Sequence, residues 1–300
     1  MMNQKIIKTI IDWAKKEDPI RAVILTGSLA GKGSTLRDES IDSPQGDRVD
    51  ELSDYDIAIF TTDIKKYADD DSWLHTIETV LVYEPCKRYK NNKEYPTRLV
   101  IYKDALQVDF SLFDLDYLKY LTEQEVLPVE YNLGYKILLD KDDLTKNLKP
   151  PTYEYPYTQK PSKEEFELAI QIFFFEAFKE AKALVRNDLW HAKLRDWTTK
   201  EYLLRMIQWH EKAKHGWNYD TNCDGKRMQS WVDPIVWQDA HKIFSRFEKD
   251  DSFTSLIFSI NLFRKVSTEV GKILGYRYLT DVDKNITDLV KKLHAFCKNN

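Results

Sequence analysis

The stretch Asp54-Tyr55-Asp56-Ile57-Ala58-Ile59-Phe60 places two acids at the start of an apolar run that is typical of a strand. Side chains two residues apart on a strand project from the same face, about 6.6 to 7 Å apart, so the carboxylates of Asp54 and Asp56 are expected to lie together. A third acid, Asp109, lies in the strand-like run 106–112. Carboxylates gathered on adjacent strands repel one another unless a cation separates them, and Mg²⁺ prefers oxygen ligands and also binds nucleotide phosphates. The pattern therefore predicts metal-assisted nucleotidyl transfer, with the three acids as catalytic groups and metal ligands.

A Gly-Ser pair supports this interpretation. The apolar run 22–25 leads into Gly27-Ser28, and residues 28–31 are expected to open a helix whose free N–H groups hold a phosphate. The structural alternative is that the acids of the Asp-x-Asp motif stand at the start of a strand only because that end is wet, since short motifs match by chance. We favour the nucleotide and metal site because the chain has, in this order, a strand, a Gly-Ser turn, a strand with two acids and a strand with one acid.

Composition limits the function classes. The chain has 300 residues, 42% hydrophobic and 31% charged, as in an ordinary globular protein of about two domains. It contains no apolar run of membrane-spanning length and no signal-peptide core at its N-terminus, so we expect a cytoplasmic protein without membrane contact. The cysteines, Cys86, Cys223 and Cys297, have neither disulfide nor zinc spacing. A net charge of -4 argues against nucleic-acid binding and favours a cationic small-molecule acceptor.

The pattern of elements predicts an α/β (α+β) protein with two domains. We expect an N-terminal catalytic domain over residues 1–150, with a mixed sheet and flanking helices. A Pro- and Tyr-rich linker over 151–161 is expected to connect it to an all-helical substrate-binding domain over 162–300. The cleft between the domains is the expected active site.

Within the first domain we expect helices over residues 3–16 and 72–80, a strand over 21–25 and the strand that follows Asp54. Two further strands, over 97–102 and 106–112, are expected to form a hairpin across residues 103–105. Ser162 and Glu165 form a capping box that predicts the start of a long helix.

The chain resembles the nucleotidyltransferase superfamily of DNA polymerase β type through its Gly-Ser, Asp-x-Asp and lone Asp residues. More specific stretches in the second half resemble the aminoglycoside 6-adenylyltransferases, the streptomycin-modifying enzymes, and the resemblance covers essentially the whole chain. These stretches are Lys182-Ala183-Leu184-Val185-Arg186, Trp209-His210-Glu211-Lys212-Ala213-Lys214-His215-Gly216-Trp217-Asn218, Gly225-Lys226-Arg227, Trp231-Val232-Asp233-Pro234, Trp237, Leu262-Phe263-Arg264 and Leu274-Gly275-Tyr276-Arg277-Tyr278.

The resemblance implies transfer of AMP from MgATP to a hydroxyl of an aminoglycoside such as streptomycin, which gives antibiotic resistance. Gly27 and Ser28 would hold the triphosphate, with ATP as co-substrate. The acids Asp54 and Asp56 would bind Mg²⁺, and Asp109 would be either a ligand or the base that accepts the proton of the acceptor. The protein is expected to be a monomer or a weak dimer.

Lys182 and Arg186 lie four residues apart, so they share one helix face. The resemblance places them among the cofactor-binding residues, directed toward phosphates; the alternative is a solvated basic face. Glu176 and Asp188 are candidates for pairing with cationic groups of the acceptor, or are simply solvated.

The chain also departs from the family pattern. The family's Gly-Ser-Arg-x-Asn is Gly27-Ser28-Leu29-Ala30-Gly31 here, so a basic phosphate contact is absent, and the loop before Asp54 is longer. Another acceptor therefore stays open: a lincosamide, another small metabolite, a protein side chain or a tRNA end. A nucleotide-binding module without activity is the non-enzymatic alternative, which the presence of all three acids disfavours. His210 and His215 are expected to be surface residues rather than metal ligands.

Overall fold

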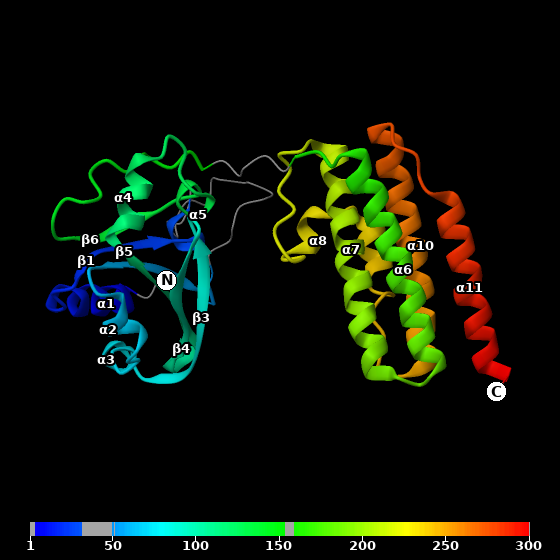
Figure 1. Ribbon diagram of the computed structural model, residues 1–300, viewed down its shortest axis with the longest axis horizontal. Coiled ribbons are helices and arrows are strands. Elements are labelled where there is room, and N and C mark those ends of the chain that lie inside the picture. Colours follow the sequence, from blue (N-terminus) through cyan, green and yellow to red (C-terminus); the bar gives the residue numbers. More distant parts are fainter. Residues whose placement is uncertain (1–3, 32–49, 51, 154–158, 300) are drawn as a thin grey trace. The chain divides into compact units, whose positions relative to one another are not determined.

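The computed structural model describes residues 4–31, 50, 52–153 and 159–299, and the chain divides into two compact units, Met1–Pro156 and Tyr157–Asn300 (Figure 1). The first unit is mixed α/β and the second is helical, which confirms the expected fold class. The long segment before Asp54, residues 32–49 and 51, lies outside the described residues. Among the described residues, no helix combines the length and apolar character needed to cross a membrane.

A mixed six-stranded sheet forms the centre of the first unit, in the order β3-β4-β5-β2-β1-β6. Strands β2 and β5 are parallel, whereas each of the other neighbouring pairs is antiparallel. The strands are β1 (Ile20–Thr26), β2 (Tyr55–Thr61), β3 (Val80–Lys90), β4 (Lys93–Tyr102), β5 (Leu106–Asp114) and β6 (Lys136–Asp140).

Helices cover both faces of this sheet (Figure 1). One face packs against α1 (Gln4–Lys16), α2 (Ile64–Ala68) and α3 (Leu74–Ile77), and the other against α4 (Leu115–Glu123) and α5 (Val129–Asn132). Side chains on a strand alternate between the faces, and Ala58 and Phe60 belong to the core on the α4 side. Asp56 therefore faces the side covered by α4 and α5.

Most of the expected elements of the first unit are present. The hairpin between the strands around 97–102 and 106–112 is confirmed, because β4 and β5 pair in antiparallel fashion. The helix expected over 72–80 is wrong at its end: α3 stops at Ile77, and the edge strand β3 begins at Val80. Strand β6, which pairs with β1, was also not expected.

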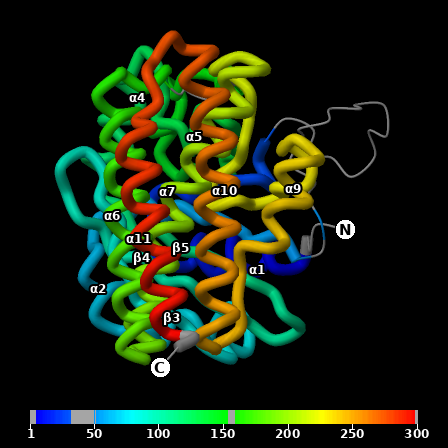
Figure 2. The backbone as a smooth tube through the Cα atoms, turned by 90° about the vertical axis from the view of Figure 1, so that its right-hand side faces the viewer, coloured from blue at the N-terminus to red at the C-terminus, as the bar shows by residue number. Residues whose placement is uncertain are grey.

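The second unit is a helical bundle in which α6 (Lys163–Val185), α7 (Leu189–His215), α10 (Lys249–Leu274) and α11 (Thr280–Asn299) run alongside one another (Figure 2). Two short helices, α8 (Met228–Trp231) and α9 (Pro234–Ala240), lie between α7 and α10 in the chain. The capping box at the start of α6 is confirmed: Ser162 accepts a hydrogen bond from the Glu165 N–H, and Glu165 accepts one from the Ser162 N–H.

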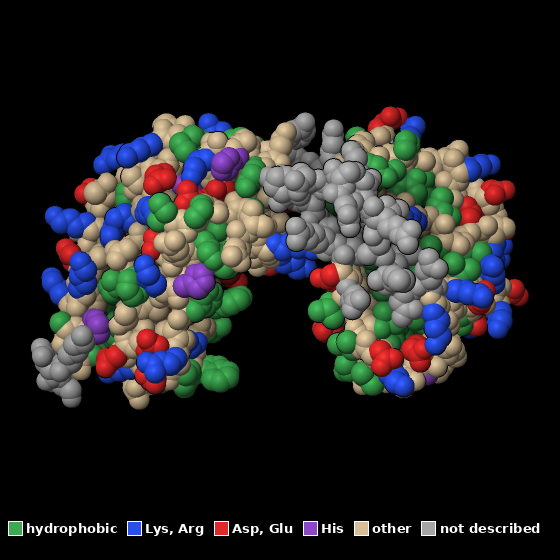
Figure 3. Space-filling model, turned by 180° about the vertical axis from the view of Figure 1, so that it is seen from behind, with side chains coloured by type: hydrophobic (Ala, Val, Ile, Leu, Met, Phe, Trp, Pro, Cys, Tyr) green, Lys and Arg blue, Asp and Glu red, His purple; other side chains and the backbone are tan. Residues whose placement is uncertain are grey.

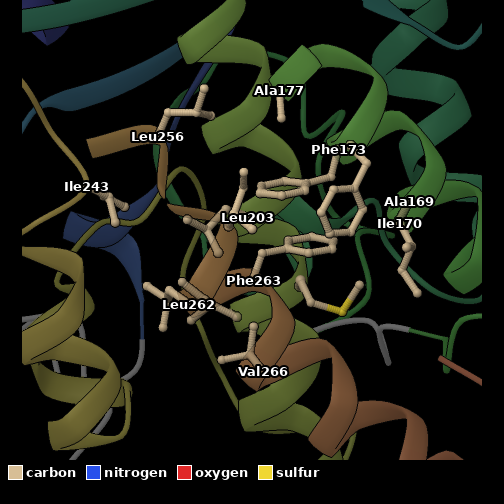
Figure 4. Packing of buried hydrophobic residues seen from close by; sticks show 14 of the residues in the cluster. Ala169, Ile170, Phe173, Ala177, Leu203, Ile243, Leu256, Leu262, Phe263 and Val266 are labelled. Carbon is tan, nitrogen blue, oxygen red and sulfur yellow. The ribbon is translucent and has the colours of Figure 1, made fainter. Parts of the chain in front are cut away.

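Aromatic packing fixes the centre of this bundle. The rings of Phe173 on α6 and Phe263 on α10 are stacked, with centroids 3.7 Å apart, and Leu203 of α7 joins the same cluster (Figure 4). Aromatic side chains bury large apolar areas, so this contact ties the three central helices together.

Candidate active site

Asp56 and Asp109 are partners across the two parallel strands of the sheet. The register of β2 on β5 sets Asp56 opposite Asp109, and Ala58 opposite Ser111 on the same face. Both acids are only partly exposed, with 30% of the Asp56 side chain and 13% of the Asp109 side chain accessible to solvent. The amide of Gln107 donates a hydrogen bond of 3.1 Å to Oδ1 of Asp109. The sheet thus brings together two carboxylates that lie 53 residues apart in the sequence (109 − 56).

The Gly-Ser turn borders this pair. Strand β1 ends at Thr26, which is paired with Asp56, and Gly27 follows with φ 72°. A Cβ atom on Gly27 would lie 2.0 Å from Oδ2 of Asp56, so glycine is required both by the backbone conformation and by the close approach. Ser28–Ala30 then forms a single 3₁₀ turn. The helix expected to open at Ser28 is therefore only this short turn, because Gly31, which follows it, has an extended backbone.

Asp54 directly precedes β2 and is partly exposed. Among the described residues, no group of three or more His, Cys, Asp or Glu side chains is arranged to hold a metal ion, and the set of Asp54, Asp56 and Asp109 is no exception. Mg²⁺ in nucleotide sites is usually held by one or two carboxylates together with substrate phosphates and water. The paired Asp56 and Asp109 supply two such carboxylates on adjacent strands and therefore fit such an ion.

A basic side chain that the sequence pattern did not predict lies against both acids. Nη2 of Arg88, on the edge strand β3, is 3.5 Å from Oδ2 of Asp109 and 3.9 Å from Oδ1 of Asp56. The contact reaches over β4, so it depends on strand order and register, and β3 itself was not expected.

Lys136 on β6 is a second cationic group that was missed. Its Nζ donates a hydrogen bond of 2.9 Å to the carbonyl oxygen of Leu29, in the turn after Ser28. Burial lowers the pKa of the Lys136 ammonium below its usual value. Leu29 is itself buried, in the core on the α1 side, and it stands where the family pattern has arginine. Lys136 thus brings a positive charge to this turn from another strand.

The other predicted residues lie in the helical unit. Lys182 is exposed near the end of α6, with its Nζ 5.6 Å from the centroid of the Phe178 ring, and Arg186 is the exposed C-cap of the same helix. Glu176 is buried and forms ion pairs with Lys179 and Arg195. Asp188 is exposed at the start of α7.

His210 is not the surface residue that its Lys-rich segment suggested. It is buried, with Nδ1 2.9 Å from Oε1 of Glu211 and Nε2 2.7 Å from Oε2 of Glu269 on α10. Burial alone would lower the pKa of His210, but the hydrogen bonds to the two carboxylates outweigh it and raise the pKa above the ordinary value. The side chain of His215 is half-exposed, with Nε2 3.6 Å from Oε2 of Glu211. We therefore interpret His210 as a charged link between α7 and α10.

A mixed sheet that pairs two carboxylates beside a Gly-Ser turn, followed by a helical unit, defines a protein of the nucleotidyltransferase class. The family model described as streptomycin adenylyltransferase matches residues 1–293, and the chain belongs to this family. The family expected from the sequence is thereby confirmed, and the chain is a nucleotidyltransferase.

Individual relatives match over nearly the whole chain. The aminoglycoside 6-adenylyltransferase of Bacillus subtilis strain 168 is 24% identical over 305 residues, covering 98% of this chain and 99% of the relative. The aminoglycoside 6-adenylyltransferase of Campylobacter jejuni is 26% identical over 282 residues, covering 92% of this chain and 90% of the relative. The crystal structure of an aminoglycoside 6-adenyltransferase from Bacillus subtilis has 21% sequence identity and a TM-score of 0.45, covering 98% of this chain and 99% of that chain.

Proposed function

We propose that this enzyme transfers AMP from ATP to a hydroxyl group of an aminoglycoside, with streptomycin as the expected acceptor, and so gives antibiotic resistance. The observation that carries the proposal is the pairing of Asp56 with Asp109 next to the Gly27 turn. The names of the matched relatives support the reaction and the acceptor class.

In the proposed reaction, the acceptor oxygen forms a bond to the α-phosphorus of ATP. The bond from that phosphorus to its bridging oxygen breaks, and its electrons leave with pyrophosphate. Asp56 and Asp109, with Asp54 beside them, would hold Mg²⁺, which supplies charge neutralisation for the triphosphate when bound. Gly27 and Ser28 lie where the phosphates would approach the backbone, and Lys136 sets a positive charge at the same turn.

Asp109 is the proposed acceptor of the hydroxyl proton. Its Oδ1 receives the hydrogen bond from Gln107, which orients the carboxylate. A carboxylate held in one orientation is suited to general-base catalysis if the hydroxyl reaches its other oxygen. The alternative role for Asp109 is that of a metal ligand only.

The proposed acceptor is a cationic small molecule, and a nucleic acid is disfavoured. The net charge is -4, and on the face seen in Figure 3 basic and acidic side chains are interspersed over both units. A nucleic-acid surface usually concentrates basic residues on one face. We further propose a cytoplasmic monomer or weak dimer, with Lys182 and Arg186 of the helical unit directed to phosphates.

One experiment tests the proposal directly. The protein is incubated with labelled ATP, Mg²⁺ and a panel of aminoglycosides, and pyrophosphate release and acceptor mass are measured. Streptomycin is expected to gain the mass of one AMP. A lincosamide is included because Leu29 departs from the family pattern. If only the lincosamide is labelled, the proposed acceptor is wrong and the proposed reaction is retained. Absence of pyrophosphate release with every acceptor would contradict the proposal.

A further inference from the structure

Arg88 lies on the same face of the sheet as the two paired acids. Arg88 on β3 is paired with Tyr95 on β4. Leu99, four residues after Tyr95 and so on the same face of β4, is paired with Asp109 on β5. Residues that are opposite one another in adjacent strands share a face, so Arg88 and Asp109 are on the same side of the sheet, as is Asp56. The register thus explains why the long side chain of Arg88 lies on the face of the sheet that carries both carboxylates.

The geometry of the contact is that of an ion pair rather than a directed hydrogen bond. The guanidinium nitrogen is 3.5 Å from Asp109 and 3.9 Å from Asp56, beyond the usual length of an N–H···O bond. One positive charge therefore faces two carboxylates, of which Asp109 is 13% exposed. Two close, partly buried carboxylates repel each other, and leaving them without a cation is costly.

We propose that Arg88 is a positioning residue that acts as the counter-ion of Asp56 and Asp109 before a divalent metal binds, and that it turns to the nucleotide phosphates once the metal takes the carboxylates. The inference rests on the proposed function, in which these acids hold the metal. Arginine suits both roles because its charge is permanent and its planar donors fit carboxylate and phosphate alike. It also supplies from β3 a basic group that Leu29 cannot supply from the turn.

The inference predicts effects of opposite sign for one substitution. In Arg88→Gln, metal alone should bind more tightly, because a competing cation has been removed, whereas the nucleotide should bind more weakly, because a phosphate contact has been lost. A merely structural ion pair would weaken both or change neither. The metal-free variant should also melt a few degrees below wild type, since the two carboxylates are left uncompensated.

The test uses Mn²⁺ alone as the metal probe and a non-hydrolysable ATP analogue with Mn²⁺ as the nucleotide probe, both by calorimetric titration, together with thermal melting of the metal-free protein. Arg88→Gln should lower the Kd for Mn²⁺ by about twofold to fivefold, the effect of removing one partly exposed ion pair, and raise the Kd for the analogue. Arg88→Lys keeps the positive charge, so its Kd for Mn²⁺ should stay close to wild type, whereas its Kd for the analogue should rise less than in Arg88→Gln because only the planar donors are lost.

Lys87→Gln is the matched control. Lys87 is the neighbour of Arg88 on β3, has an exposed side chain paired with Glu94, and points to the opposite face. All three measurements should be unchanged in this variant. If Arg88→Gln does not fold, the double variant Arg88→Gln/Asp109→Asn, which removes one charge of each sign, should recover folding and melting.

The outcomes separate the inference from the proposed function. If wild type transfers AMP but Arg88→Gln binds Mn²⁺ and the analogue as wild type does, the inference fails alone. If Arg88→Gln is less stable but binds Mn²⁺ no more tightly, Arg88 is only structural and the inference is overturned. If wild type neither transfers AMP nor binds Mn²⁺, the proposed function fails; an unchanged melting temperature of Arg88→Gln would then overturn the counter-ion role as well.

Discussion

Gly27 approaches the carboxylate of Asp56 so closely that a Cβ atom on Gly27 would lie 2.0 Å from Oδ2 and 2.9 Å from Cγ. Gly27 also has φ 72°, a conformation that L side chains rarely adopt. The turn after β1 and the acid on β2 therefore constrain each other, and any side chain at position 27 must displace the carboxylate.

We expect Gly27→Ala to reduce turnover about 100-fold, because a displacement of about 1 Å in a catalytic constellation has an effect of that size. Steady-state kinetics measures it. Gly216→Ala is the matched control: Gly216 also has positive φ, but nothing lies within 4 Å of its added Cβ, so backbone strain should lower stability while turnover of the folded enzyme is kept. Near-normal turnover of Gly27→Ala would mean that Asp56 does not need its present position.

Asp54→Asn and Asp56→Asn should each abolish transfer, since under the proposed function each would remove a ligand charge that contributes several kcal/mol to transition-state stabilisation. Their melting temperatures should remain close to wild type or rise, because repulsion among the acids is relieved. Asp116→Asn, which changes an exposed acid of α4, should keep full activity. If either variant of the motif kept normal turnover, the catalytic site would have to lie elsewhere.

Asp109→Asn distinguishes the two roles left open for Asp109. If Asp109 is the base, turnover falls steeply while ATP binding is retained, and the acidic limb of the pH–rate profile disappears; if it is mainly a ligand, the Mg²⁺ dependence shifts as well. The measurement is a pH–rate profile at two Mg²⁺ concentrations. An acidic limb that stays in place in this variant would argue against the base.

His210 should make the stability of the helical unit depend on pH. Its pKa in the folded protein is raised, so its charged hydrogen bonds stabilise the fold fully below the unfolded pKa of about 6.5 and lose this effect as pH rises through the folded pKa. We expect His210→Gln to lower the free energy of unfolding by about 1 to 3 kcal/mol at pH 6 and by less at pH 9. Denaturant titrations at the two pH values measure this difference. The control is His191→Gln, at an exposed position of the same helix. A loss that is equal at both pH values would show that His210 is not charged in the fold.

The strands that carry the acids could be predicted because they are buried. Strands β1 and β2 have nearly continuous apolar runs, whereas β5 alternates apolar and polar residues along most of its length, and both patterns are typical of strands in a sheet. Strand β3 could not be predicted in the same way, because it is an exposed edge strand with charged residues and Pro85. Arg88 was missed with it, since its contact with Asp109 depends on the register of two ladders, β3–β4 and β4–β5.

The sequence pattern likewise does not predict which charged residues are buried. Lysines around His210 suggested a solvated segment, yet Lys212 is buried and its Nζ donates to the carbonyl of Tyr219, while Glu269 comes from another helix. Such compensation is set by tertiary contacts between residues far apart in the chain, and no local period encodes it.

Streptomycin should bind in the presence of an ATP analogue and Mg²⁺, and higher salt should weaken its binding. Streptomycin carries two guanidinium groups, which pair well with carboxylates, and partly exposed charge pairs are screened by salt. Of the acids expected to contact it, Glu176 is already paired with Lys179 and Arg195, and Asp188 is exposed. Asp188→Asn should therefore raise the Kd for streptomycin in a calorimetric titration, about twofold to fivefold for an exposed ion pair. Asp250→Asn, which changes an exposed acid at the start of α10, should leave the Kd unchanged. If streptomycin does not bind but another acceptor is turned over, the streptomycin assignment is wrong and the nucleotidyltransferase activity stands.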